Sequence, residues 1–151
     1  LVFGGSSGHH NKLLRKLPEG ICSLVNLEEL VLDKCKTLQA LPESLGNLTK
    51  LTRLSMKECK AIREIPQSIG NCGMLVEINL LKCVSLQHIP ASIGQLLDLE
   101  DLSLGKCKSL VSLPGTLATL DRLAFLDLHH CKNLCELPKG MENMTSLHRL
   151  D

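Results

Sequence analysis

Leucine and isoleucine recur along this chain with a fixed spacing of 24 residues. Within each period, a leucine, a polar residue and a second leucine alternate, and this alternation predicts a short β-strand with one buried face. Chance does not align so many positions, so the period predicts a solenoid built from stacked repeats. The apolar columns are Leu27, Leu51, Leu75, Leu99, Leu123 and Leu147, then Leu30, Leu54, Ile78, Leu102, Leu126 and Leu150, then Leu32, Met56, Leu80, Leu104 and Leu128.

Proline marks the second half of every period. All six prolines keep the 24-residue spacing, at Pro18, Pro42, Pro66, Pro90, Pro114 and Pro138. Proline suits a return limb that needs no backbone N–H for a strand ladder, so we expect a loose helical or 3₁₀ turn there. A hydroxyl residue follows two positions later and is a candidate cap for that turn, at Ser44, Ser68, Ser92 and Thr116.

One repeat reads L-x-x-L-x-L-x-x-C-x-x-L-x-x-L-P-x-x-I-G-x-L-x-x, which is the leucine-rich repeat pattern. It predicts an α/β solenoid in the form of a horseshoe arc. A parallel sheet should line the concave face, and loops with short 3₁₀ turns should form the convex face. The array of 1–151 divides into a degenerate first repeat 1–26, repeats 27–50, 51–74, 75–98, 99–122 and 123–146, and a truncated repeat 147–151.

The first repeat keeps the frame only in part. Phe3, Asn11 and Leu14 fit their columns, whereas Ser6 and Gly8 stand where the strand core should be apolar. The chain also stops in mid-motif and neither end carries a polar cap, so we expect it to be an excerpt of a longer array.

Five of the eight cysteines also follow the repeat, at Cys35, Cys59, Cys83, Cys107 and Cys131. A small thiol just after the strand packs well where the chain turns inward, and its S–H can donate to a turn carbonyl, so we expect a ladder of reduced, structural cysteines. Cys72 replaces a core leucine and should be buried. Cys22 and Cys135 stand in columns of glycine or polar residues, so we expect them to be exposed.

Cysteine usage also bears on the compartment. Paired terminal cysteines are absent, which favours a reducing, cytoplasmic location. The sequons at Asn47 and Asn143 point weakly the other way. Both share one repeat column, so we interpret them as by-products of the repeat.

The net charge of the chain and the motifs that it lacks reduce the number of possible function classes. Lys+Arg 17 against Asp+Glu 16 gives a net charge of +1, which disfavours nucleic acid as a partner, and no apolar run is long enough for a membrane span. The cluster His129, His130, Cys131 and Cys135 resembles a metal site, but Cys131 should point inward, so we expect no metal. Phosphate-binding, zinc-protease and nucleophile-elbow motifs are absent, and we expect neither cofactor nor enzymatic activity.

Protein partners are the remaining class, because outward strand positions of a parallel array form one continuous surface. The candidate binding face consists of Glu29, Val31, Arg53, Ser55, Lys57, Glu77, Asn79, Leu81, Asp101, Ser103, Phe125, Asp127, His129 and Arg149. Phe125, its only aromatic residue, is either a binding hot spot or an isolated surface side chain.

Two strips of opposite charge flank this face. The acidic strip lies where the strands start, and the basic strip lies where they end. They either steer a polar protein partner or only keep a leucine-rich stack soluble. The acidic strip contains Glu28, Glu29, Glu77, Glu100 and Asp101, and the basic strip contains Lys34, Lys36, Lys57, Lys60, Lys82, Lys106, Lys108 and Lys132.

The stretches LPESLGNLTKLTRLSMKEC and LPGTLATLDRLAFLDLHHC resemble the leucine-rich repeats of plant intracellular immune receptors, the nucleotide-binding NLR proteins. The resemblance covers about residues 14–151 and depends on C-x-x-L after the strand, followed by L-P. It implies a cytoplasmic segment that recognises a pathogen effector or holds neighbouring domains of its own receptor inactive. The repeats are also similar to substrate-docking arrays of bacterial effector ubiquitin ligases. A spacer without a partner of its own is the third alternative.

Overall fold

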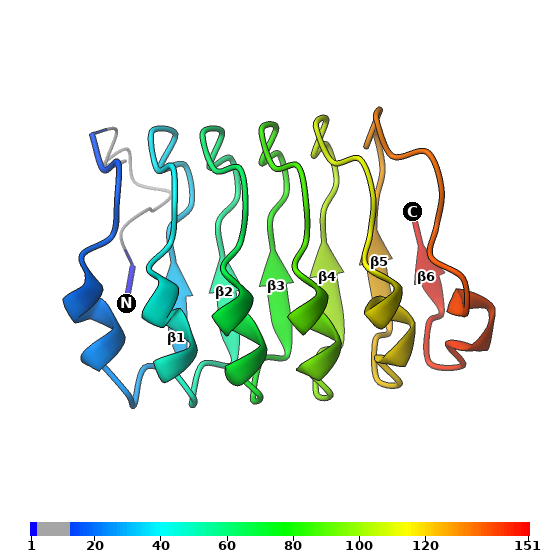
Figure 1. Ribbon diagram of the computed structural model, residues 1–151, viewed down its shortest axis with the longest axis horizontal. Coiled ribbons are helices and arrows are strands. Elements are labelled where there is room, and N and C mark those ends of the chain that lie inside the picture. Colours follow the sequence, from blue (N-terminus) through cyan, green and yellow to red (C-terminus); the bar gives the residue numbers. More distant parts are fainter. Residues whose placement is uncertain (3–12) are drawn as a thin grey trace.

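The computed structural model describes residues 1–2 and 13–151 and contains a six-stranded parallel sheet in chain order (Figure 1). Its strands are β1 (Glu29–Val31), β2 (Arg53–Ser55), β3 (Glu77–Asn79), β4 (Asp101–Ser103), β5 (Phe125–Asp127) and β6 (Arg149–Leu150). Every strand pairs with the next one 24 residues along, so that Leu30 faces Leu54 and Leu54 faces Ile78. The hydrophobic period therefore predicts both the strands and their register correctly.

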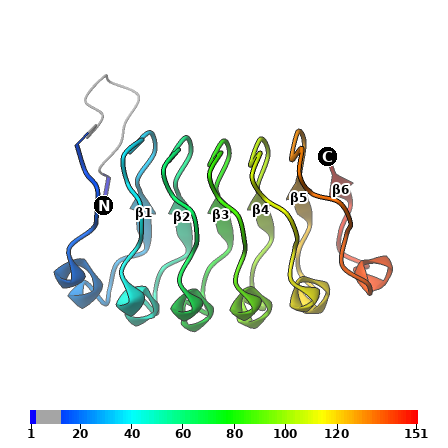
Figure 2. The same ribbon diagram turned by 45° about the horizontal axis from the view of Figure 1, so that its top comes forward.

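Short 3₁₀ helices form the opposite side of the stack, as the proline column predicts (Figure 2). They are η1 (Glu19–Ser23), η2 (Glu43–Asn47), η3 (Gln67–Asn71), η4 (Ala91–Gln95), η5 (Gly115–Thr119) and η6 (Met141–Asn143). Within residues 1–2 and 13–151, no helix has the length and apolar run needed to cross a bilayer.

The prediction that hydroxyl side chains cap these helices is wrong. The residue before η1 to η5 is the proline itself, and its carbonyl accepts the first helical hydrogen bond, as from Leu45 N to Pro42 O at 3.1 Å. Three of the four hydroxyls instead connect neighbouring repeats, as where Ser68 Oγ accepts from Gly46 N at 3.3 Å and Thr116 Oγ1 donates to Ala91 O at 2.6 Å. The fourth, Ser92 Oγ, is buried and has no hydrogen-bond partner among the described residues.

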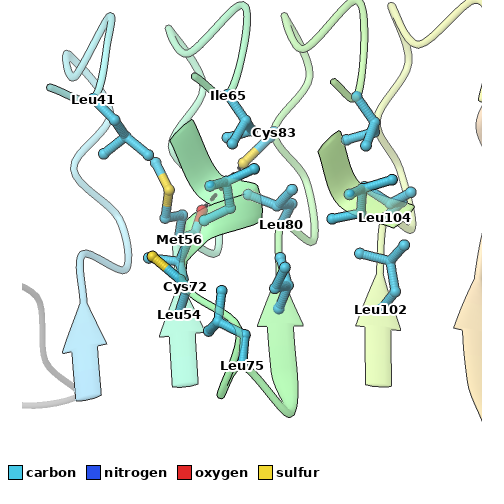
Figure 3. Packing of buried hydrophobic residues seen from close by; sticks show 14 of the residues in the cluster. Leu41, Leu54, Met56, Ile65, Cys72, Leu75, Leu80, Cys83, Leu102 and Leu104 are labelled. Atoms are coloured by element: carbon cyan, nitrogen blue, oxygen red, sulfur yellow. Dashed lines mark hydrogen bonds between the residues drawn. The ribbon is translucent and has the colours of Figure 1, made fainter. Parts of the chain in front are cut away.

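The core is a stack of aliphatic layers between the sheet and the 3₁₀ helices (Figure 3). Leu54, Leu75 and Leu102 are completely buried, as are the equivalent leucines of most other repeats. Burying one such side chain contributes about 1.5–3 kcal/mol to folding. Together with the sheet and the turns, these layers make the chain a leucine-rich repeat solenoid.

The periodic cysteines form the expected ladder between repeats. The carbonyl of Met56 accepts a hydrogen bond from Cys59 N at 3.2 Å and a second from Cys83 Sγ at 3.1 Å (Figure 3). Cys59, Cys107 and Cys131 donate in the same way to the equivalent carbonyl of the preceding repeat. The first four ladder cysteines are buried, Cys131 is half-buried, and Cys72 is buried as predicted.

The two remaining cysteines differ. Cys135 is exposed as predicted, but the prediction that Cys22 is exposed is wrong, because Cys22 is only 2% exposed. Cys22 shares its column with Gly46, where an added Cβ would clash with the Ser68 carbonyl of the next repeat. Glycine in this column therefore marks a close approach of two 3₁₀ helices and not an exposed turn.

A left-handed residue follows each strand in five repeats, and none of the five is glycine. Their φ angles lie between 58° and 63°, at Lys34, Glu58, Lys82, Lys106 and His130. This conformation costs roughly 1–2 kcal/mol for a residue with a Cβ. A backbone hydrogen bond to the next repeat offsets the cost, as from Lys82 N to Gly105 O at 2.8 Å.

The start of the array is described only in part. Val2 bridges to Val31, Lys16 bridges to Ala40, and η1 keeps the helical half of the repeat. The interpretation of Phe3, Ser6, Gly8 and Asn11 as fitting or departing from the repeat concerns positions outside the described residues.

Replacing Lys34 by glycine should stabilise the chain. Glycine adopts a φ of 62° without steric cost, so Lys34→Gly should raise the free energy of unfolding by about 1 kcal/mol in urea denaturation. Lys36→Gly is the matched control, because Lys36 has no positive φ and glycine there only adds chain entropy. A gain in Lys36→Gly equal to that in Lys34→Gly would contradict the strained turn.

Thiol alkylation should separate the ladder from Cys135. Burial raises the pKa of Cys59 and of Cys107 to about 12, and the thiolate is the reactive form. Iodoacetamide at about pH 8 should therefore modify exposed Cys135 at least roughly 100-fold faster than these two thiols, as followed by mass spectrometry. Cys135→Ser should abolish the fast phase, and urea should make every thiol react. Fast labelling of Cys59 in the folded chain would show that the reagent reaches the ladder cysteines, and would contradict their burial.

Candidate functional site

The candidate binding face is built by the strand residues on either side of each buried central leucine or isoleucine. Because Leu30, Leu54 and their equivalents point into the core, the residues before and after them point outward. Eleven of the fourteen candidates lie within β1–β6, and Lys57, Leu81 and His129 follow two residues after their strands. The parallel register brings all of them into rows across the sheet.

The first row pairs charges and one aromatic ring across neighbouring strands. Arg53 Nε on β2 donates to Glu77 Oε2 on β3 at 2.8 Å, and this contact raises the pKa of the arginine. Phe125 on β5 is half-buried beneath Arg149 of β6, whose guanidinium carbon lies 4.7 Å from the ring centroid. The aromatic candidate is therefore part of a cation–π pair and not an isolated side chain.

The middle row is more buried than the outward pattern suggests. Ser55 is 1% exposed, and Ser103 and Asp127 are each 8% exposed. Ser55 Oγ donates to Asp33 Oδ1 at 2.7 Å, and the same oxygen accepts from Lys57 N at 2.9 Å. These side chains hold the surface in place and offer little area of their own. Val31 and Asn79 remain half-exposed.

His129 lies over Gly105 at the end of β5. His129 Nδ1 is 2.5 Å from Asp127 Oδ1, which also accepts from His129 N at 3.0 Å. A Cβ on Gly105 would meet the imidazole of His129 and the carboxylate of Asp127, so a larger residue there would have to displace these two side chains. The sequence shows an isolated glycine in this column, but its reason is visible only in the structure.

The histidine–cysteine cluster offers no metal-binding arrangement. Cys131 Sγ donates to Leu104 O at 3.2 Å, and Cys135 Sγ donates to Asn133 O at 3.4 Å. Among residues 1–2 and 13–151, no three His, Cys, Asp or Glu side chains gather where they could hold an ion.

The two charged strips differ in how their members are paired. Glu28, Glu29 and Glu100 are exposed along the acidic strip, whereas Glu77 is held by Arg53. On the basic side, Lys82 Nζ donates to Glu58 Oε1 at 3.1 Å, and this hydrogen bond lowers the pKa of Glu58. Glu58 interrupts the basic strip, and Lys82 balances its negative charge.

The surroundings of Asp101 on the sheet surface disfavour the charged form of its carboxyl group. Burial raises its pKa, and the neighbouring carboxylates Glu77 and Asp127 raise it further, although Ser103 Oγ donates to Asp101 Oδ1 at 3.2 Å. The folded chain therefore holds this proton more tightly than the unfolded chain does. Stability must fall as the pH rises from the ordinary aspartate pKa through the raised pKa of the folded state.

Replacing Asp101 by asparagine should remove this pH-dependent loss. The asparagine amide keeps an acceptor for Ser103 and carries no charge, so Asp101→Asn should raise the Tm at pH 7 by on the order of 1–2 °C. Below about pH 3 both proteins are neutral at this position, and their Tm values should coincide. Glu29→Gln, at the exposed start of β1, is the control with no expected effect. An equal gain at both pH values would contradict the electrostatic explanation.

Comparison with protein-family models finds no match, and comparison with curated proteins finds none either. Among solved structures, a leucine-rich repeat protein of Leptospira interrogans is 24% identical, with a TM-score of 0.39 over 91% of this chain and 52% of that one. The leucine-rich repeat domain of the type III effector XopL is 20% identical, with a TM-score of 0.44 over 91% of this chain and 72% of that domain.

The Arabidopsis receptor kinase HAESA, solved with the peptide hormone IDA and a co-receptor, is 24% identical, with a TM-score of 0.44 over 90% of this chain and 35% of that one. This chain therefore spans about half of the Leptospira protein and about a third of the receptor kinase. These likenesses extend to the repeat fold alone, which the 24-residue register of this chain already establishes.

Proposed function

We propose that this chain is a protein-recognition segment that binds its partner through the strand face of β1–β6. The observation that carries the proposal is the composition of the first outward row, which runs Glu29, Arg53, Glu77, Asp101, Phe125 and Arg149. The buried columns repeat one residue type, whereas this row changes from strand to strand. A surface of preset, varied side chains on a rigid sheet suits recognition of one protein, because little freedom is lost on binding.

We further propose that the parent protein is a plant intracellular NLR immune receptor. The resemblance of the repeats, with C-x-x-L after the strand and then L-P, supports this origin, and the buried thiol ladder suits a reducing cytoplasm. In this role the segment binds a pathogen effector or the neighbouring domains of its own receptor. It recognises and does not catalyse, and it needs no cofactor.

Sequencing the parent transcript in both directions tests the proposed origin. A plant NLR receptor should carry a G-x-x-x-x-G-K-[ST] loop upstream of these repeats. A secretion leader upstream and an unrelated catalytic domain downstream would instead support the substrate-docking array of a bacterial effector ligase. A transcript with neither feature would leave the spacer alternative and overturn the immune-receptor proposal.

Charge reversal on the strand face should weaken partner binding. The probe is the nucleotide-binding domain of the parent receptor, expressed separately and titrated by calorimetry in low salt. Glu77→Lys combined with Asp101→Lys should raise the Kd at least about tenfold. The reason is that two positive charges replace two negative ones at the centre of the face and repel the groups of the partner that the acids attract. The Tm should change little, since ion pairs that solvent still reaches, such as half-buried Arg53–Glu77, contribute only about 0–1 kcal/mol.

Glu43→Lys combined with Asp121→Lys is the matched control. Both acids are exposed and lie outside the strands, Glu43 at the start of η2 and Asp121 just after η5, so this variant has the same net charge and should bind normally. Equal loss in both variants would mean that net charge, and not the strand face, controls binding.

A further inference from the structure

A groove outside the strand face gathers positive charge. It has a volume of about 580 Å³ and lies among the loops that follow β1, β2 and β3, which form the upper edge in Figure 1. Its lining contains three cations, two uncharged polar side chains and one alanine: Lys36, Lys60, Arg63, Gln39, Ser85 and Ala61. The three cations and Gln39 are exposed.

The cations of this groove are placed where they repel one another. Lys36 and Lys60 occupy the same repeat column, so their backbones are roughly one strand spacing, about 4.8 Å, apart. Two like charges on neighbouring loops repel each other. Arg63 adds a third positive charge from the same loop as Lys60.

No acid among residues 1–2 and 13–151 forms an ion pair with these three cations, although Lys60 lies near enough to Glu58 to help lower the pKa of that carboxyl. Within these described residues, no ion pair or side-chain hydrogen bond joins Lys36, Lys60 or Arg63 to a carboxylate. The nearby carboxylate of Glu58 is held by Lys82 Nζ at 3.1 Å. The sequence of 3–12, in the preceding repeat, contains neither Asp nor Glu, so it supplies no counter-charge either.

The combination of three cations is local, although the lysine column itself continues. The column of Lys36 and Lys60 holds Val84 in the next repeat and lysine again at Lys108 and Lys132, whereas the column of Arg63 continues with the uncharged residues Gln87, Val111 and Cys135. Basic side chains that served only solubility would not need to cluster, and they would best be interspersed with acidic residues. The groove therefore has the composition of an anion-binding site.

The shape of the groove favours a polypeptide over a small molecule. Sites for small molecules enclose most of the ligand and are lined mainly by apolar groups. This groove is open and is lined by lysine stems, an amide and a hydroxyl. Acidic side chains on one side of an extended peptide recur about every 6.7 Å, a spacing that flexible lysine side chains on adjacent loops can reach.

We propose that this groove binds an acidic, extended segment of a protein, with the carboxylates of the segment paired to Lys36, Lys60 and Arg63. Gln39 and Ser85 supply hydrogen bonds to its backbone. The interaction is independent of the strand face, because the groove lies on the loops and shares no lining residue with the fourteen candidates of the sheet.

The test is a titration of the 151-residue chain with a labelled ten-residue peptide of alternating Glu and Ser, followed by fluorescence anisotropy in about 50 mM salt. Lys36→Gln, Lys60→Gln and Arg63→Gln together should weaken binding at least about tenfold. The matched control removes three exposed cations of later repeats, by Lys108→Gln, Lys132→Gln and Lys139→Gln, and should weaken binding less than about threefold.

Two further measurements keep the result interpretable. Lys36→Arg, Lys60→Arg and Arg63→Lys together preserve the charge and should bind the peptide nearly as well as the parent chain, which separates lost contacts from lost folding. A peptide with Gln in place of every Glu should not bind.

Three outcomes would overturn the proposal. The first is no binding of the acidic peptide, and the second is equal weakening in the groove variant and its control. In the third, inorganic tripolyphosphate displaces the peptide and binds the groove more tightly, which would assign the site to a small phosphate ligand.

Discussion

The structure depends on one constraint, which is that the nearest neighbour of each strand residue is the residue 24 positions further along the chain. Parallel pairing in this register brings Leu30 against Leu54 and Leu54 against Ile78. Every column must therefore tolerate residues of its own kind at about 4.8 Å. Aliphatic columns gain from this contact because they bury apolar surface on both sides of every layer. The stack grows in chain order, and the limb that carries one 3₁₀ helix joins each strand to the next.

The polar columns satisfy the same constraint in different ways. The cysteine column uses a small donor, so that one carbonyl such as Met56 O accepts from its own turn and from the next repeat. The first row of the sheet alternates in sign where Arg53 meets Glu77. In the loops after β1 and β2, Lys36 and Lys60 occupy one column, and neither forms an ion pair within the described part of the chain.

The core, the strands and the 3₁₀ helices follow from the sequence because each depends on one repeated contact. The errors occur where a contact joins two different columns. Cys22 is buried because the glycine column of one 3₁₀ helix packs against the backbone of the next. Three of the four hydroxyls after proline bridge repeats, since the proline carbonyl already accepts the first helical bond. Neither relation is visible in a single repeat.

The sequence by itself determined the period, the register and the identity of the aliphatic core columns, because hydrophobic burial acts between equivalent positions. Tertiary structure decided which outward residues offer surface. Ser55, Ser103 and Asp127 alternate as exposed residues should, yet neighbouring side chains cover them. It also placed Arg149 over Phe125 and brought Arg63 and Ser85 to one groove. These relations depend on side-chain reach and on loop geometry across repeats, which a pattern of apolar and polar positions does not contain.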